Sequence, residues 1–221
     1  MSKTPAEIAA WYDAFLPYME RDAQSTNPRR EHIKGVLRQI LKPGMTVLEP
    51  GCGIGLNSIF MARDLLCKVT AVDISPRLIE RARELNGHEN VEYIAGDFIG
   101  CPERTREYDA VILCDVLEHI PNERLSLFIN AACLRTEGPV YVNLPGLDYQ
   151  NYISDNAPHL QQIIDNSMSP VWVCHEFNAF GFHPAYMSIY GIDALYQYQE
   201  YVFLRSEVIQ EQINGSLKLR K

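Results

Sequence analysis

The sequence predicts an α/β fold: a Rossmann-like, doubly wound sheet of seven mostly parallel strands, closed by a C-terminal antiparallel hairpin and covered by helices on both faces. Two observations support this prediction. Up to about residue 145, short β-rich runs alternate with helical patterns of roughly 10–14 residues, an order typical of parallel sheets. Beyond that point, two β-rich runs follow each other closely, as the strands of a hairpin do.

The N-terminal part predicts two helices. Residues 5–20 form a short amphipathic pattern that is rich in aromatic side chains. Residues 21–28 are a polar break that ends in Asn27-Pro28, which is a helix start signal. The helix that follows has an apolar stripe at helical spacing, made of Ile33, Val36, Leu37, Ile40 and Leu41. Pro43-Gly44 ends this helix.

Strands and helices then alternate. The first strand is expected at about 46–49 and the fifth at 140–144, and three β-rich runs with their exit loops lie between them, at 68–75, 91–98 and 108–119. Two helices carry an apolar face: one with Leu78, Ile79, Ala82 and Leu85, and one at about 122–134. Right-handed crossovers bring the carboxyl ends of parallel strands to one edge, where ligands bind in such sheets.

The C-terminal part is different in composition. Residues 146–203 hold seven of the twelve tyrosines of the chain, most of which we interpret as core and sheet cover. Two runs, at 186–190 and 196–204, predict the closing hairpin, with its turn at 191–193. An insertion at about 146–182 separates this hairpin from the fifth strand.

The length of 221 residues fits one domain with a sizeable core. Within this single domain, 1–28 is expected to be an N-terminal helical cap and 29–145 a cofactor-binding core. The insertion at 146–182 is expected to form an acceptor pocket, and 183–221 to form the closing hairpin and the tail.

The charge and the cysteines limit the function classes. A net charge of −8 argues against a broad surface for nucleic acid or anionic membranes, and we expect Arg29 and Arg30 to lie on a solvated face. The sequence has no apolar signal core and no apolar stretch near 18 residues. The six cysteines form no C-x-x-C pair, so free thiols and a cytoplasmic location are expected.

The most informative stretch is residues 47–55 (VLEPGCGIG), in which an acid and three alternate glycines follow a strand. Glycine allows a sharp turn and a close approach of the backbone to a ligand. The dinucleotide motif G-x-G-x-x-G does not fit, because the third glycine comes one position early and Leu56 stands in its place. The acid before the glycines favours a ligand with both an amine and a carboxylate over a pyrophosphate.

Two further acids end the next two strands. Asp73 lies 24 residues after Glu49, where an acid can accept hydrogen bonds from a ribose diol, while Ser75 caps the following helix. The third run ends in Gly-Asp-Phe, which places Asp97 and Phe98 at the same edge of the sheet. An acid at that position can accept an adenine amine, and an aromatic ring can pack beside the base.

These motifs, in this order over about residues 30–145, resemble the class I S-adenosylmethionine-dependent methyltransferases. The Leu-Glu-His-Ile run after the fourth strand is similar to that of small-molecule methyltransferases of the ubiquinone and menaquinone biosynthesis type. The resemblance implies methyl transfer from S-adenosylmethionine to an O, N or C atom of a small-molecule acceptor. The implied cofactor-binding residues are Glu49, Gly51, Gly53 and Gly55 for the methionine part, Asp73 and Ile74 for the ribose and adenine edge, Asp97 and Phe98 for adenine, and Cys114 through its carbonyl.

The catalytic signal is weaker, because methyl transfer depends mainly on positioning. His119 is the best candidate for a general base, and a histidine that only orients a neighbouring loop is the alternative. His175 and His183 in and after the insertion, and Tyr12 and Tyr18 in the first helix, are candidate substrate residues.

Several alternatives remain open at this point. Asp115, Glu118 and His119 form a D-x-x-E-H pattern that is similar to the metal cluster of small-RNA methyltransferases, but we expect no metal. A nicotinamide-dependent oxidoreductase, a peptide or protein methyltransferase and a non-catalytic cofactor-binding subunit are the competing functions. The expected partner is a small-molecule acceptor, with no nucleic acid and no membrane, and the sequence leaves the oligomeric state open.

Overall fold

A computed structural model describes residues 3–101 and 106–211 of the chain. Its centre is one seven-stranded sheet with the order β3-β2-β1-β4-β5-β7-β6. The five strands from β3 to β5 in that order are parallel, and β7 and β6 form the antiparallel hairpin at the edge. The strands are β1 (Thr46–Pro50), β2 (Lys68–Asp73), β3 (Val91–Ala95), β4 (Ala110–Cys114), β5 (Val140–Pro145), β6 (Phe182–Tyr190) and β7 (Tyr198–Arg205).

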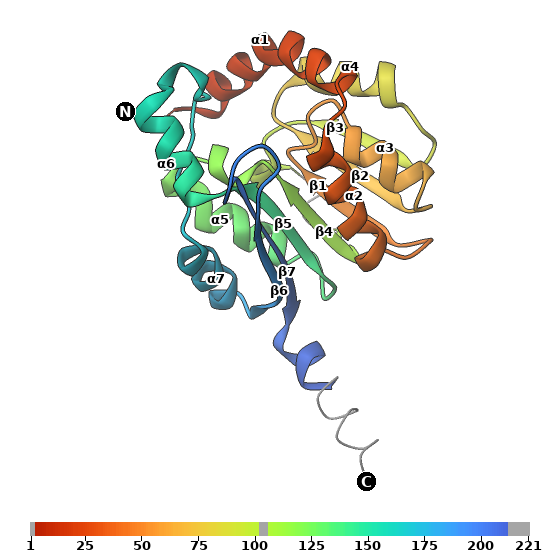
Figure 1. Cartoon of the computed structure of the whole chain (residues 1–221). Coiled ribbons are helices and arrows are strands. Elements are labelled where there is room, and N and C mark those ends of the chain that lie inside the picture. The colour runs from red at the N-terminus through yellow and green to blue at the C-terminus, as the bar shows by residue number, and fades with distance from the viewer. Residues whose placement is uncertain (1–2, 102–105, 212–221) are drawn as a thin grey trace.

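Helices cover both faces of the sheet (Figure 1). The α-helices are α1 (Pro5–Gln24), α2 (Pro28–Ile40), α3 (Leu56–Arg63), α4 (Pro76–Asn86), α5 (Asn122–Cys133), α6 (Leu147–Asn156) and α7 (Pro170–Ala179). Short 3₁₀ turns are η1 (Phe98–Gly100), η3 (Leu117–His119) and η4 (Pro158–Leu160). The predicted seven-stranded, doubly wound α/β architecture is therefore confirmed.

Strand alternation divides the apolar side chains into two cores. Val47 and Ile112 pack with α2, α3 and α4 on one face. Leu48 and Val111 pack with α5 and α7 on the other face. Because successive side chains of a strand point to opposite faces, near-continuous apolar strands are what a sheet covered on both sides requires.

The hairpin differs from the prediction in its bounds. β6 begins at Phe182 rather than at residue 186, and β7 begins at Tyr198, so Tyr196 lies in the connection between them. The strand includes Pro184, which an edge strand tolerates, and a register shift between Pro184 and Tyr186 marks a bulge. Because the proline and the bulge interrupt the β pattern, the start of this strand could not be predicted from the sequence.

The N-terminal helix begins with a capping box in which Thr4 and Glu7 bond each other's backbone amides, and it continues to Gln24 instead of ending at residue 20. In Figure 1, α1 runs over the top of the molecule. It is fixed to α4 by an ion pair between Glu20 and Arg81, at 2.6 Å. This position makes α1 a cover for one end of the sheet.

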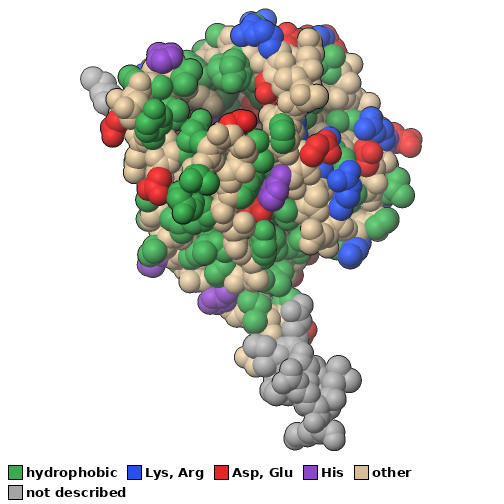
Figure 2. Space-filling model, in the orientation of Figure 1, with side chains coloured by type: hydrophobic (Ala, Val, Ile, Leu, Met, Phe, Trp, Pro, Cys, Tyr) green, Lys and Arg blue, Asp and Glu red, His purple; other side chains and the backbone are tan. Residues whose placement is uncertain are grey.

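The surface of the described residues mixes both charges. On the face shown in Figure 2, Lys and Arg side chains lie among Asp and Glu side chains, chiefly on the side of α2. None of the described helices is long and apolar enough to cross a membrane. All six cysteines are free thiols.

Candidate functional site

A cavity of about 770 Å³ lies at the carboxyl ends of the parallel strands. The loops that leave β1, β2, β3 and β4 form its floor. α1 covers it, and α6, η4 and the segment that follows η4 close the side. The volume lies in the range of small-molecule sites. The position is the one at which open α/β sheets bind their ligands.

The glycine turn after β1 requires glycine for two reasons. Gly51 and Gly55 have φ of +77° and +80°, which other residues seldom adopt. A Cβ on Gly51 would lie 2.6 Å from Cγ2 of Val116, and one on Gly55 would lie 2.3 Å from the hydroxyl of Tyr93. Gly51 and Gly53 line the cavity, whereas Gly55 is the N-cap of α3 behind them.

The amides of this turn bond within the protein. The amides of Gly51 and Cys52 both donate to the carbonyl of Val72, and the amide of Gly55 donates to the carbonyl of Cys52. The turn therefore shapes the cavity floor, and these three amides are not directed at a ligand.

Asp73 at the end of β2 lies in the cavity wall and joins two loops. Its Oδ2 accepts from the amide of Gly53 at 2.8 Å, and its Oδ1 accepts from the amide of Ser75 at 2.9 Å. Burial raises the pKa of Asp73 to about 6. Each carboxylate oxygen has a second lone pair, so both can still accept from a ligand. The neighbouring Ile74 also lines the cavity.

Asp97 and Phe98 lie at the end of β3 and line the same cavity. Asp97 forms an ion pair with Arg124 of α5, which holds its carboxylate in place. The ring of Phe98 packs edge-on against Phe128, with 5.1 Å between centroids. The structure thus brings Gly51, Gly53, Asp73, Ile74, Asp97 and Phe98 together around one space.

Glu49 and Cys114 do not reach the cavity wall. Glu49 is on the face of β1 that packs against α3, where its carboxylate accepts a hydrogen bond from the hydroxyl of Ser58. Burial raises the pKa of Glu49 to about 7. Cys114 is buried as well, and burial raises the pKa of its thiol. A contact between Glu49 and a ligand therefore stays a prediction. The side chain of Glu49 points toward α3, and this orientation does not favour the contact.

His119 lies in η3, lines the cavity and is nearly fully buried. Its Nδ1 lies 2.8 Å from the carbonyl oxygen of Ile164. A carbonyl only accepts, so Nδ1 carries the proton, and Nε2 of the neutral ring has its lone pair free. Burial lowers the pKa of His119, which keeps the ring neutral near pH 7. Nε2 lies 3.7 Å from Oε1 of Glu118.

The four candidate substrate residues lie in different places. Tyr12 is in the cavity wall and donates a hydrogen bond to Gln162 at 2.8 Å. Tyr18 lines the rim and is 55% exposed. His175 on α7 has a side chain that is 78% exposed, and neither it nor His183 on β6 lines the cavity. Of these four residues, Tyr12 and Tyr18 line the cavity that His119 also lines, and Tyr12 packs against the ring of His119.

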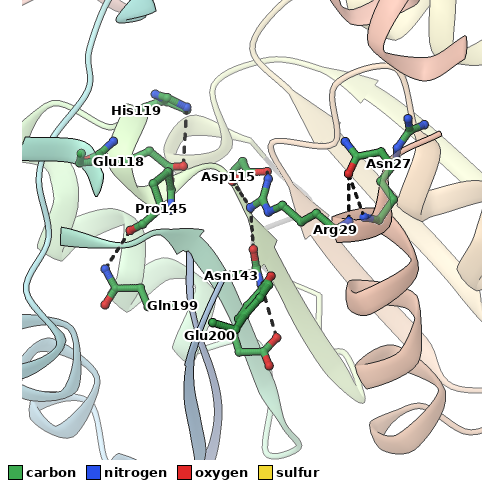
Figure 3. Close-up of polar contacts among 12 residues, drawn as sticks. Asn27, Arg29, Asp115, Glu118, His119, Asn143, Pro145, Gln199 and Glu200 are labelled. Atoms are coloured by element: carbon green, nitrogen blue, oxygen red, sulfur yellow. Dashed lines mark hydrogen bonds and ion pairs between the residues drawn. The ribbon is translucent and has the colours of Figure 1, made fainter. Parts of the chain in front are cut away.

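Sequence reasoning missed Arg29, for which the expectation of a solvated face was wrong. Figure 3 shows its guanidinium reaching from α2 to the carboxylate of Asp115, to which both terminal nitrogens donate. The same group donates to Oδ1 of Asn143 at 2.6 Å and lies 4.0 Å from the ring centroid of Tyr198. Arg29 and Asp115 both line the cavity. A charged residue directly inside the N-terminus of a helix is too common a pattern to reveal this contact.

A second missed feature is the buried network behind Arg29. Glu200 is fully buried and accepts from His32 Nε2 at 2.9 Å and from the Tyr141 hydroxyl at 2.8 Å. Asn143 connects it to Arg29, since its amide nitrogen lies 3.4 Å from Glu200 (Figure 3). A chain of buried hydrogen bonds thus holds the guanidinium group of Arg29 in place at the cavity.

The D-x-x-E-H residues lie in different surroundings. Within residues 3–101 and 106–211, no three His, Cys, Asp or Glu side chains are placed to hold a metal ion. Asp115 bonds Arg29 instead, and neither carboxylate oxygen of the buried Glu118 has a hydrogen-bond partner.

Comparison with known proteins finds similarity to methyltransferases. A family of methyltransferase domains matches residues 47–138. The ubiquinone biosynthesis O-methyltransferase of Xanthomonas campestris pv. campestris (strain B100) is 32% identical over 146 residues, which are 65% of this chain and 59% of that relative. The chain thus spans about three fifths of the length of the curated relatives it matches.

Solved structures agree with the fold. The putative methyltransferase of Haloferax volcanii, solved in complex with the Trm112 methyltransferase activator, has a TM-score of 0.71 at 16% identity and covers 88% of this chain and 97% of its own. Magnesium protoporphyrin IX methyltransferase from Synechocystis PCC 6803, solved with bound SAH, has a TM-score of 0.62 at 19% identity. The match covers 88% of this chain and 82% of that protein. The chain is therefore similar to methyltransferases over residues 47–138, and it shares its fold with the two solved proteins.

Proposed function

We propose that this protein transfers the methyl group of S-adenosylmethionine to an O, N or C atom of a small-molecule acceptor. The observation that carries the proposal is the convergence, at one cavity, of the glycine turn, Asp73 and Asp97 from three successive strands. The family match over residues 47–138 supports it independently of that geometry.

The residues present fit the cofactor. The glycines at 51 and 53 allow the floor of the cavity to approach a ligand closely, and Asp73 keeps lone pairs for the hydroxyls of a ribose. Ile74 and Phe98 offer apolar surface for a base, and Asp97 is held beside them by Arg124. In this proposal Glu49, Gly55 and Cys114 shape the turn and the strand ends from behind, because they do not line the cavity.

The chemistry that the chain must add is limited. When bound, S-adenosylmethionine supplies a methyl group on a positively charged sulfur, which is already a good electrophile. The protein has to hold an acceptor atom in line and to exclude water, and α1 and the segment around Gln162 enclose the cavity for that purpose. Nε2 of His119, with its lone pair free, is placed to take a proton from the acceptor.

The domain organisation is part of the proposal. We assign the helical cap, the core, the insertion and the closing hairpin to one methyltransferase domain, because one sheet contains all seven strands. The insertion forms part of the cavity wall through α6 and η4, which supports its assignment as the acceptor side. Tyr12 closes the same wall from α1.

The acceptor class rests on the relatives. The name of the Xanthomonas relative specifies methyl transfer to oxygen in ubiquinone biosynthesis, and this supports a small-molecule acceptor here. The name of the Haloferax complex favours a second possibility, in which the chain works with an activator protein. Methyl transfer by the purified chain alone distinguishes the two.

The proposal is tested by calorimetric titration of the purified chain with S-adenosylmethionine and S-adenosylhomocysteine. We expect binding of both, and about tenfold or weaker affinity in Asp73→Ala, because hydrogen bonds to a charged group are lost. Asp64→Ala is the matched control, since Asp64 lies on the surface and pairs with Arg63. Absence of binding to either nucleoside would overturn the proposed function.

A further inference from the structure

One wall of the cavity contains buried acceptor atoms without partners. The side chain of Glu118 is 1% exposed, and within residues 3–101 and 106–211 no other residue donates a hydrogen bond to either of its carboxylate oxygens. Oε1 of Gln150 on α6 is also buried, and it has no hydrogen-bond partner in the described part of the chain. Both residues line the cavity. A buried acceptor that is left unpaired destabilises the folded state, and a charged one does so more strongly, so a donor within the cavity would satisfy these atoms.

This wall is separate from the cofactor motifs. In the sheet, β4 lies on one side of β1, and β2 and β3 lie on the other. Asp73 and Asp97 therefore stand at one end of the cavity, and Glu118 follows β4 at the other end. The backbone carbonyl of Glu118 accepts from the amide of Asn166, which joins this end to the segment after η4.

Two acidic side chains at this end have no Lys or Arg partner among the described residues. Arg29 neutralises Asp115, and Arg124 neutralises Asp97. Glu118 and Asp165 remain, and in the described part of the chain their only basic neighbour within 4 Å is His119. The Nδ1 proton of His119 is directed at the carbonyl of Ile164, so this neutral ring does not compensate either acid.

Aromatic side chains face the same space. Trp11, Tyr12 and Phe15 of α1 line the cavity, and the rings of Tyr12 and His119 are 6.2 Å apart at their centroids. Burial raises the pKa of the Tyr12 hydroxyl, so that it stays protonated and donates to Gln162. Carboxylates combined with aromatic rings are the surroundings that ammonium groups prefer in proteins.

We propose that Glu118 and Gln150 form a subsite for a protonated amine on the methyl acceptor. The ammonium group donates to the carboxylate of Glu118 and to Oε1 of Gln150, and its positive charge stabilises that carboxylate once Glu118 has released its proton. That the amine belongs to the methyl acceptor rests on the proposed function. Binding of an amine at this wall, however, can be measured without turnover.

The proton balance of this step is distinctive. Burial, together with the charge of Asp115, raises the pKa of Glu118 well above its ordinary value, so the empty subsite holds the neutral acid. Binding of an ammonium group converts the acid into a carboxylate, and the carboxyl proton goes to the buffer. Arg29, Asp165 and His119 also face Glu118, and their own partners in the structure stay in place. An alcohol of the same shape requires no such proton release.

The experiment compares benzylamine with benzyl alcohol as probes. Each is titrated calorimetrically into the full chain saturated with S-adenosylhomocysteine, at pH 7.0 in phosphate and in Tris buffer. We expect benzylamine to bind about tenfold more tightly than the alcohol. We also expect the amine, and not the alcohol, to release about one proton, which is measured from the difference in heat between the buffers.

Two variants locate the effect. Glu118→Gln should abolish both the amine preference and the proton release, and Gln150→Met should weaken amine binding several-fold while proton release continues. Glu80→Gln, which removes an exposed acid of α4, should change neither. Equal affinity of the unmodified chain for the two probes, or full amine preference in Glu118→Gln, would overturn the inference. Binding of S-adenosylhomocysteine in the same samples reports separately on the proposed function.

Discussion

Arg29 of α2 and Asp115 after β4 form a bidentate ion pair at the wall of the cavity, although 86 residues separate them in the sequence. The side chain of Arg29 is 14% exposed and that of Asp115 is 40% exposed. Asp115 has φ of +51°, a conformation that is uncommon outside glycine. The pair therefore fixes the loop after β4, which also contains Glu118 and His119, against the helix that precedes β1.

The first prediction concerns this pair. Arg29→Lys keeps the charge but loses the second parallel hydrogen bond and the contact with Tyr198, so we expect the free energy of unfolding to fall by about 1–2 kcal/mol. Urea denaturation measures it. Arg63→Lys is the matched control, because Arg63 pairs with Asp64 at the surface, where such pairs contribute less than about 1 kcal/mol. Equal effects of the two substitutions would contradict the structural role of Arg29.

The second prediction concerns His119. Because burial lowers its pKa, the unfolded chain takes up a proton near pH 6.5 while the folded chain does not. Stability is therefore present above the unfolded pKa and falls as the pH drops below about 6.5. His119→Gln should reduce this dependence. An NMR titration, with the resonance assigned from the same variant, should give a pKa below 6.5, and a value above 6.5 would contradict the buried neutral ring.

Much of this site could be predicted from the sequence, because its parts follow strand ends. Asp73 ends β2, and Asp97 and His119 lie in the loops that leave β3 and β4. Parallel strands bring their carboxyl ends to one edge. Arg29 could not be predicted in the same way, since no local pattern indicates which residue 86 positions away it meets. Such contacts depend on the packing of α2 on the finished sheet.

Glu49 shows that a motif alone does not give the direction of a side chain. Its place beside the glycines suggests a ligand contact, but strand alternation puts Glu49 on the same face as Val47, which packs against the helices on that side. The acid therefore bonds Ser58 of α3.

The third prediction follows from that burial. The pKa of Glu49 is raised from 4.5 to about 7, so the folded state holds its proton where the unfolded state has released it. This contribution to stability is complete below about pH 4.5 and is lost as the pH rises through 7. Glutamine does not titrate, so Glu49→Gln keeps its stability where the unmodified chain loses it. We expect the difference in free energy of unfolding between the two to shift in favour of the variant by up to about 3 kcal/mol from pH 4.5 to pH 8. Urea denaturation at both pH values measures this, with the exposed Glu80→Gln as the control; a gain that is independent of pH would count against a protonated Glu49.

The fourth prediction compares two tyrosines that donate to the same buried carboxylate. The hydroxyl of Tyr141, which is fully buried, lies 2.8 Å from Glu200, and the hydroxyl of Tyr186, which is 45% exposed, lies 3.0 Å from it. Water can replace the exposed donor but not the buried one. Tyr141→Phe should lower the free energy of unfolding by about 1–3 kcal/mol, and Tyr186→Phe by less than about 1 kcal/mol. Equal losses of stability in the two variants would show that the depth of the network does not determine its contribution.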